Sequence, residues 1–188
     1  MCIRDSIGAT LGSIFSILPA AAPDPFLQPG TTQRAAGLAL YGPQTLLVLS
    51  VGEGTDAFVL DAGRFVLARP RMHVPRQRPE FAVNASNHRH WEPAARAYVD
   101  DCLAGRAGPL GVDYNHRWLG CVAAEAYRVL VRGGLYLYPR DVRPGVESGR
   151  LRLAYEANPI AMLIEQAGGT ATDGEQPILE IVPRALHQ

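Results

Sequence analysis

The stretch WLGCVAAEAYRVLVRGGLYLY, residues 118–138, decides the predicted fold class of this chain of 188 residues. Residues 118–132 are predicted to form a helix that ends at Gly133-Gly134, because paired glycines favour helix termination. Residues 135–138 then form an apolar strand that ends before Pro139. This segment therefore indicates a helix followed directly by a strand.

The same alternation continues on both sides of this stretch. Strands are predicted at residues 81–83, 151–155 and 178–182, and helices at residues 91–104 and 159–167. The last of these helices is expected to begin with Asn158 as its N-cap and Pro159 as its first residue. Strands that alternate with helices indicate an α/β sheet domain, so the predicted fold class is α/β.

The first 80 residues differ from the rest of the chain in their predicted secondary structure. They indicate β structure at residues 7–17, a strand at 45–51, and a hairpin that joins 57–61 to 64–69, whereas residues 31–44 are predicted to be weakly helical. A proline-rich linker follows at 74–79. We therefore expect a non-native leader at 1–6, a remnant of an N-terminal sheet domain at 7–78, and a C-terminal α/β domain at 79–188.

The composition excludes several classes of function. Eighteen basic and eighteen acidic side chains give a net charge of zero, so no overall positive field exists to collect nucleic acid or anionic membrane. All the basic side chains are arginine, and any anion must be bound by local clusters of them. No run of 18 apolar residues predicts a transmembrane helix. Cys2, Cys102 and Cys121 form no CxxC pair, which favours a reducing, cytoplasmic setting.

The segment RLRLAYEANP, residues 150–159, carries the most chemistry. In a strand, Arg150 and Arg152 would share one face, and Glu156 would lie just past the carboxyl end, where α/β sheets bind ligands. A carboxylate there suits a hard cation such as Mg²⁺, and the two arginines suit phosphate oxygens. A surface strand with solvated arginines is an equally good interpretation of this segment alone.

Three other segments place polar groups where they suit phosphate. Arg117 precedes a predicted helix whose free amides could join it, Asn84 follows the strand at 81–83, and Tyr138 ends the strand at 135–138. Each also has an ordinary interpretation, as a capping loop, an Asx turn and a core tyrosine. No catalytic side chain beyond a metal ligand is predicted.

The order of these motifs along the chain resembles class I fructose-1,6-bisphosphatase. The most specific motifs are YEANP at 155–159 and EQAGG at 165–169. Further matching segments are Gly12–Phe15, Tyr98–Cys102, Arg117–Gly120, Leu137–Pro139 and Ala171–Gly174.

The resemblance implies a layered sugar-phosphatase fold and Mg²⁺-dependent hydrolysis of the 1-phosphate of fructose 1,6-bisphosphate to fructose 6-phosphate, in gluconeogenesis or the Calvin cycle. It also implies a cytoplasmic homotetramer that takes a sugar bisphosphate and has no nucleic-acid or membrane partner. The resemblance implies that Asn84 and Tyr138 contact the 6-phosphate, and that Arg117 contacts the 6-phosphate of the substrate in a neighbouring subunit. It implies that Arg150 contacts the sugar and that Arg152 lies near the 1-phosphate. It also implies that Glu156 is a ligand of Mg²⁺.

Some features depart from the family pattern. Asn87 and Trp118 occupy positions that are often tyrosine, and Arg150 stands where the family usually has lysine. The family's Asp-Pro-Leu-Asp-Gly-Ser-Ser motif, expected just before Ile7, is not in the sequence. We therefore expect an incomplete chain that is inactive alone. A sedoheptulose-1,7-bisphosphatase or dual-specificity enzyme, and a non-catalytic sugar-phosphate-binding remnant, are alternative interpretations.

Overall fold

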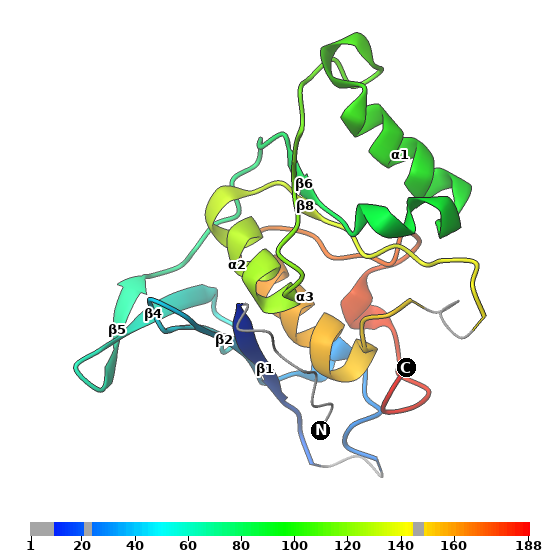
Figure 1. Ribbon diagram of the computed structural model, residues 1–188. Helices are drawn as coiled ribbons and strands as arrows, with labels where there is room; N and C mark the ends of the chain where they lie inside the picture. The colour runs from blue at the N-terminus through cyan, green and yellow to red at the C-terminus, as the bar shows by residue number, and fades with distance from the viewer. Residues whose placement is uncertain (1–9, 21–23, 145–148) are drawn as a thin grey trace.

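The computed structural model describes residues 10–20, 24–144 and 149–188. The expected leader at residues 1–6 and the start of the predicted β segment at residue 7 lie outside these ranges. Within them the chain forms two sheets and three α-helices (Figure 1). The predicted α/β class is therefore confirmed. No helix among the described residues is long and apolar enough to cross a bilayer.

The first sheet is an antiparallel meander of five strands in chain order. It consists of β1 (Leu11–Ile17), β2 (Ala35–Tyr41), β3 (Leu46–Ser50), β4 (Thr55–Asp61) and β5 (Arg64–Arg69). The structure confirms the strand predicted at 45–51 and the hairpin that joins β4 to β5. It shows that the weak helix predicted at 31–44 is wrong, because β2 occupies most of that segment.

The reason for that error is tertiary. The sequence AAGLALY of β2 is rich in alanine and leucine, which favour helix locally. Pairing with β1 and β3 overrides this preference, since Ala36 and Leu38 are completely buried in the core. At Gly37 a Cβ atom would lie 2.3 Å from Cζ of Phe15 and 2.9 Å from the backbone carbonyl oxygen of Val48, so glycine lets the neighbouring strands pack this closely.

The second sheet is parallel and has β6 (Glu80–Ala82) between β7 (Asn115–Arg117) and β8 (Leu135–Tyr136). The helices are α1 (Pro93–Leu103), α2 (Val122–Arg132) and α3 (Asn158–Gln166). The short 3₁₀ turns are η1 (Gly30–Thr32), η2 (Ala85–His90), η3 (Gly105–Ala107) and η5 (Ile178–Glu180), and a π-helical turn, η4, spans Leu153–Ala157.

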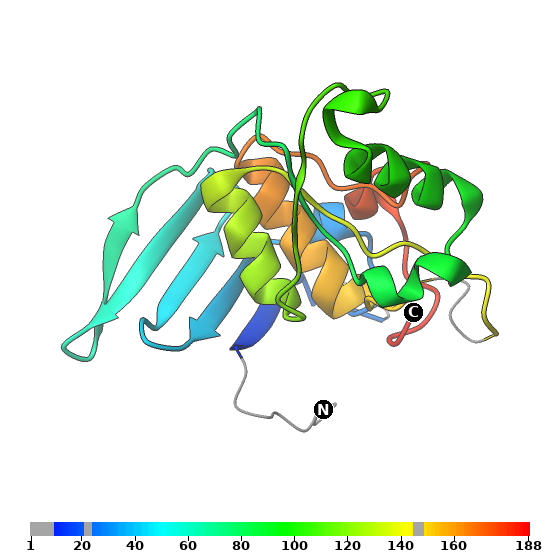
Figure 2. The ribbon, with the colours of Figure 1, turned by 45° about the horizontal axis from the view of Figure 1, so that its top comes forward.

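Helices α2 and α3 cover one face of the five-stranded sheet (Figure 2). Their side chains meet those of the sheet in the main hydrophobic core, which includes Leu38, Val48, Ala123, Leu130 and Leu163. A smaller core lies beneath α1 and contains Phe81, Val83, Trp91, Val99 and Cys102. The two expected domains thus share a core, and the division at residues 78 and 79 stays a prediction.

Two predicted strands near the C-terminus are wrong. Leu153 and Ala154 are consecutive and both buried, which a strand of alternating faces does not allow, and the backbone instead coils into η4. The amides of Glu156 and Ala157 both donate to the carbonyl of Arg152. Within the strand predicted at 178–182, Ile178–Glu180 form the 3₁₀ turn η5.

Two predicted helix starts also shift. Helix α2 begins at Val122, four residues later than predicted, because Gly120 has a φ angle of +72° and Cys121 is extended as the N-cap. Helix α3 begins at Asn158, so Ala157 is its N-cap and Asn158 makes no side-chain capping bond.

Candidate functional site

The carboxyl ends of the parallel strands place three side chains at one edge of the second sheet. Asn84 lies two residues after β6, Trp118 directly follows β7, and Tyr138 lies two residues after β8. The amide of Leu137 donates to the carbonyl of Ala82 at 2.9 Å, which holds the chain after β8 beside β6. Because ligands of α/β sheets bind at this edge, it is the place to look for a site.

A small, narrow pocket lies at this edge. Asn84, Tyr138 and Arg150, which are separated by as many as 66 residues in the sequence, all line it. Asn87 and Asp141 add further polar groups, and the apolar wall is formed by Val83, Trp91, Leu137 and Pro139. The structure therefore brings three of the predicted site residues together, while their roles stay predictions.

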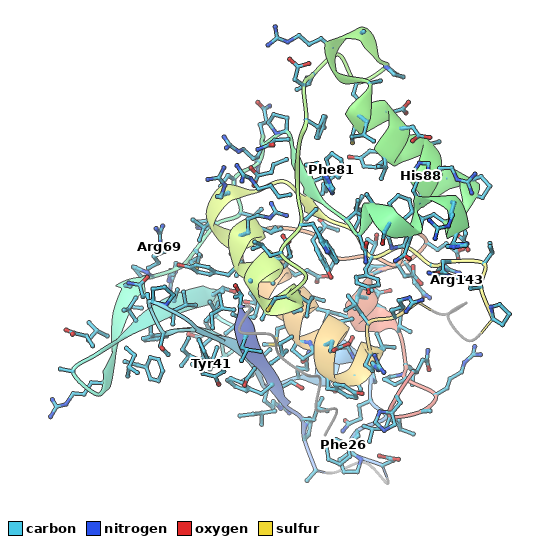
Figure 3. The ribbon with its side chains drawn as sticks, viewed as in Figure 1. Phe26, Tyr41, Arg69, Phe81, His88 and Arg143 are labelled. Carbon is cyan, nitrogen blue, oxygen red and sulfur yellow. The ribbon has the colours of Figure 1, made fainter. Side chains whose placement is uncertain are left out.

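The electrostatics of the pocket are set by Asp141, whose side chain is 4% exposed. Arg143 donates to it through Nε and Nη2, and Nη2 of Arg150 lies 3.8 Å from its Oδ2. The hydrogen bonds from Arg143 outweigh the effect of burial and lower the pKa of Asp141 to about 2. One carboxylate thus faces two guanidinium groups, which leaves an excess positive charge for an anion. Arg143, the arginine that donates to Asp141, is labelled in Figure 3.

Two amide side chains are fixed beside these charges. Arg143 donates from Nη2 to Oδ1 of Asn87 at 3.0 Å. Oδ1 of Asn84 accepts from the backbone amide of Ser86 at 3.3 Å and from its hydroxyl at 2.5 Å. Because the carbonyl oxygen of each amide group is already engaged, its NH₂ group is the part that can donate to a ligand.

An aromatic cluster adjoins Tyr138. The ring of Trp118 lies 6.2 Å from that of Tyr138 and, nearly parallel, 6.2 Å from that of Tyr136. Burial raises the pKa of Tyr136, so its hydroxyl stays protonated. The tryptophan therefore supplies ring surface next to the pocket.

Arg152 and Glu156 lie together in the turn after Arg150. Oε2 of Glu156 accepts from the amide of Arg152 at 2.7 Å, and Nη1 of Arg152 donates to the carbonyl of Arg150 at 3.1 Å. Neither residue lines the pocket of Asn84 and Tyr138. The prediction that Arg150 and Arg152 share a strand face is wrong, because these residues are in no strand and residues 153–157 form the π-helical turn η4.

The donor set for a metal can be judged on the same turn. Glu156 offers one carboxylate, and one of its oxygens is already bonded to an amide. Over residues 10–20, 24–144 and 149–188, no three His, Cys, Asp or Glu side chains gather closely enough to hold a metal ion. The described residues by themselves therefore do not fit a complete metal centre, and no chemical step is assigned through one.

Arg117 points away from the pocket. Its Nε donates to Oε2 of Glu80 at 2.9 Å, and its side chain is 46% exposed. No periodic pattern in the sequence pointed to Glu80, Asp141 or Arg143, because each acts through partners that only the tertiary structure brings close. Of the three, only Glu80 could have been noticed in the sequence, because it is an acidic residue in the otherwise apolar strand β6.

Two models of one protein family match this chain. The family model described as Fructose-1-6-bisphosphatase, C-terminal domain, matches residues 74–188, and the N-terminal domain model matches residues 5–70. This chain belongs to the fructose-1,6-bisphosphatase family. The resemblance inferred from the sequence motifs is thereby confirmed.

Individual relatives agree with this assignment. The chain is 53% identical to a class 1 fructose-1,6-bisphosphatase of Methylibium petroleiphilum over 97% of its own length and 53% of the relative's. It is 55% identical to one from Bradyrhizobium diazoefficiens over 97% of its own length and 54% of the relative's. The chain thus spans about half the length of the curated relatives that it matches.

Solved structures of the family share the fold. The apo form of Leishmania major fructose-1,6-bisphosphatase superposes with a TM-score of 0.86 at 36% identity, covering 96% of this chain and 60% of that one. The holo form gives a TM-score of 0.87 at 35% identity, covering 96% and 57%.

Proposed function

We propose that this chain binds the sugar-phosphate end of fructose 1,6-bisphosphate, and that the activity it serves is hydrolysis of the 1-phosphate to give fructose 6-phosphate. The observation that carries the proposal is the pocket shared by Asn84, Tyr138 and Arg150 in a member of this family. Its donors are neutral or positive, and the one carboxylate that lines it is offset by two arginines. This combination suits a phosphate group.

Each side chain has a distinct part in binding. The Tyr138 hydroxyl and the Asn84 amide donate to the phosphate that is not hydrolysed, and Arg150 supplies a charge-assisted contact. Asp141 and Arg143 hold the pocket's polar side chains in position. The other end of the sugar would extend toward Arg152 and Glu156, which follow Arg150 within six residues.

Membership of this family implies a divalent metal in general, and we propose Mg²⁺, with Glu156 as the ligand that this chain contributes. Glu156 would supply one carboxylate oxygen to such an ion, and the ion would supply Lewis-acid chemistry there.

We also propose a cytoplasmic homotetramer in which Arg117 reaches the substrate phosphate of a second subunit. The side chain of Arg117 is nearly half exposed and does not line the pocket of its own chain. It is therefore free to reach the pocket of a second subunit. Sedimentation velocity on the purified chain measures the assembly directly.

Calorimetric titration with fructose 6-phosphate tests the pocket. We expect Tyr138→Phe and Arg150→Gln each to weaken binding by about 10- to 100-fold, the effect of losing one hydrogen bond to a charged group. Arg150→Lys, which restores the charge, should recover most of the affinity. Tyr41→Phe is the matched control, because Tyr41 bonds Ser13 on the five-stranded sheet. Unchanged affinity in both pocket variants would overturn the proposal.

A further inference from the structure

Asp141 is an unexpected residue in a pocket that is proposed to bind phosphate. It lines the pocket beside Asn84 and Tyr138, and among the described residues of that lining it is the one that carries a negative charge. Its side chain is only 4% exposed. A buried carboxylate repels an incoming anion, so it lowers the affinity of the pocket for phosphate unless its position has a compensating effect.

The carboxylate of Asp141 lies between two guanidinium groups. On one side, Nε of Arg143 lies 3.1 Å from both carboxylate oxygens, and Nη2 and the backbone amide of Arg143 donate to the carboxylate as well. On the other side, Nη2 of Arg150 lies 3.8 Å from Oδ2. Guanidinium groups bind carboxylate and phosphate oxygens with the same fork of donors. Asp141 therefore occupies the position between the two arginines that a small free anion would otherwise take.

Both arginines are accessible from solvent at this position. The side chains of Arg143 and Arg150 are 35% and 40% exposed, whereas the carboxylate between them is almost completely buried. The hydrogen bonds from Arg143 lower the pKa of Asp141 to about 2, so the carboxyl group is ionised at neutral pH. The position between the arginines is thus filled by a negative charge that belongs to the protein.

The surrounding contacts fix the carboxylate in this place. Asp141 forms an isolated antiparallel bridge with Trp91, and Nη2 of Arg143 donates to Oδ1 of Asn87 at 3.0 Å. These contacts join the segment after β8 to η2 and the residue that follows it, and both segments line the pocket. The carboxylate is therefore held between the arginines by the backbone as well as by its own hydrogen bonds.

We propose that Asp141 is a specificity-determining residue, which makes the pocket select a phosphate carried on a sugar over free inorganic phosphate. The proposal rests on the proposed function, because it takes the pocket to be the one that binds the phosphate of fructose 6-phosphate. A sugar phosphate binds through Asn84 and Tyr138 and gains further contacts through its sugar. Free phosphate has no sugar, and the position between Arg143 and Arg150 that would suit it best is already filled. Specificity of this kind comes from a repulsive group placed against the competitor.

This selection has a consequence for the proposed reaction. Hydrolysis of the 1-phosphate releases one inorganic phosphate for each substrate molecule. A pocket that bound free phosphate tightly would be occupied by this product and would exclude the next substrate. Asp141 thus limits inhibition by the product phosphate at the end of the sugar that is not hydrolysed.

Calorimetric titrations of Asp141→Asn with inorganic phosphate and with fructose 6-phosphate test the proposal. The substitution removes the charge and keeps the shape of the side chain. Binding of inorganic phosphate should tighten by about 5-fold or more, the effect of removing one unit charge about 4 Å away in water. Binding of fructose 6-phosphate should not tighten with it, because Arg150 loses the partner that aligns it. The preference for the sugar phosphate should therefore fall by about 5-fold or more.

The two titrations separate specificity from simpler roles of Asp141. Equal tightening for both ligands would mean that the carboxylate acts only by repulsion, and weakening for both would mean that it only supports the structure. Either result, or an unchanged affinity for inorganic phosphate, overturns the proposal. Asp113→Asn is the matched control, because Asp113 also pairs with an arginine, Arg106, but does not line the pocket. It should leave both affinities unchanged.

Arg143→Gln tests the position between the arginines by a second route. Combined with Asp141→Asn, it should abolish the gain in affinity for inorganic phosphate, and a gain that persists would count against the proposal. Alone, it tests the proposal even if Asp141→Asn does not fold. The carboxylate should then draw Arg150 away from the ligand and weaken binding of fructose 6-phosphate by about 10-fold. An unchanged affinity would show that Asp141 does not control Arg150.

This inference and the proposed function can fail separately. If the wild-type chain does not bind fructose 6-phosphate, the proposed function fails. If it binds, and Tyr138→Phe weakens the binding while Asp141→Asn tightens both ligands alike, the pocket is correctly assigned and the role given to Asp141 is wrong.

Discussion

Gly134 shows how one missing side chain positions the strands that carry the site. It sits between α2 and β8 with a φ angle of +81°, and a Cβ atom there would lie 2.3 Å from the carbonyl oxygen of Glu80. The sequence pair Gly133-Gly134 predicted the end of a helix correctly. It did not reveal that β8 must pass against the backbone of β6 to bring Tyr138 beside Asn84.

Replacing Gly134 by alanine should therefore destabilise the protein by more than the backbone conformation alone would cost. Gly52→Ala is a matched control, because Gly52 also has a positive φ, of +93°, but a Cβ atom there meets nothing within 4 Å. We expect a loss of about 1 kcal/mol for the control and at least about 3 kcal/mol for Gly134→Ala, measured by urea unfolding. Equal losses would show that the backbone of β6 yields readily.

Helix α2 shows at the scale of an element how a buried polar group can end a helix. Arg128 donates to Glu125 within the helix, to Glu80 on β6, and to the carbonyls of Gly133 and Leu135 just beyond the helix end. A single guanidinium group thus satisfies two carboxylates and two backbone groups between α2 and the parallel sheet. Lysine cannot supply this fork of donors.

Arg128→Met should consequently destabilise the fold by about 3–5 kcal/mol, because it leaves two buried carboxylates without their shared partner. Arg128→Lys should lie between this variant and the wild type. The exposed Arg106 offers the comparison, since Arg106→Met should change stability by about 0.5 kcal/mol or less. Thermal and urea unfolding of the three variants provide the measurement. A loss for Arg128→Met no larger than for Arg106→Met would show that the network contributes little.

The whole molecule is stabilised by a core that the five-stranded sheet and helices α2 and α3 share. Buried charges modulate that stability with pH. Burial alone would raise the pKa of Glu80, but hydrogen bonds and charges from Arg132 and Arg117 outweigh it and lower the pKa to about 2. Arg143 similarly lowers the pKa of Asp141 to about 2.

These shifts predict the direction of acid unfolding. A carboxyl group with a lowered pKa in the folded state stabilises that state above its unfolded pKa of about 4, and the contribution is lost as the pH falls toward 2. The melting temperature should therefore fall between about pH 4.5 and pH 2 in scanning calorimetry. Glu80→Gln should melt lower at pH 7 and show a shallower fall in acid. An acid dependence as steep as that of the wild type would exclude Glu80 as a source.

The sequence by itself determined the α/β class, the β4–β5 hairpin, the three helices and the family. These features depend on local turn chemistry and on motif order along the chain, which a sequence displays directly. Arg150, Arg152 and Glu156 were also recognised as neighbours, although their alternation suggested a strand. The structure has the π-helical turn η4 after Arg152 instead, in which Leu153 and Ala154 are both buried.

Only the tertiary structure decided that residues 35–41 are a strand, that Asp141 lies between Arg143 and Arg150, and that Glu80 gathers four arginines. Alanine and leucine favour a helix locally, and two neighbouring strands reverse that preference. The energy of a buried charge depends on which opposite charges lie within a few ångströms. Residues separated by dozens of positions meet at such distances only after the chain has folded.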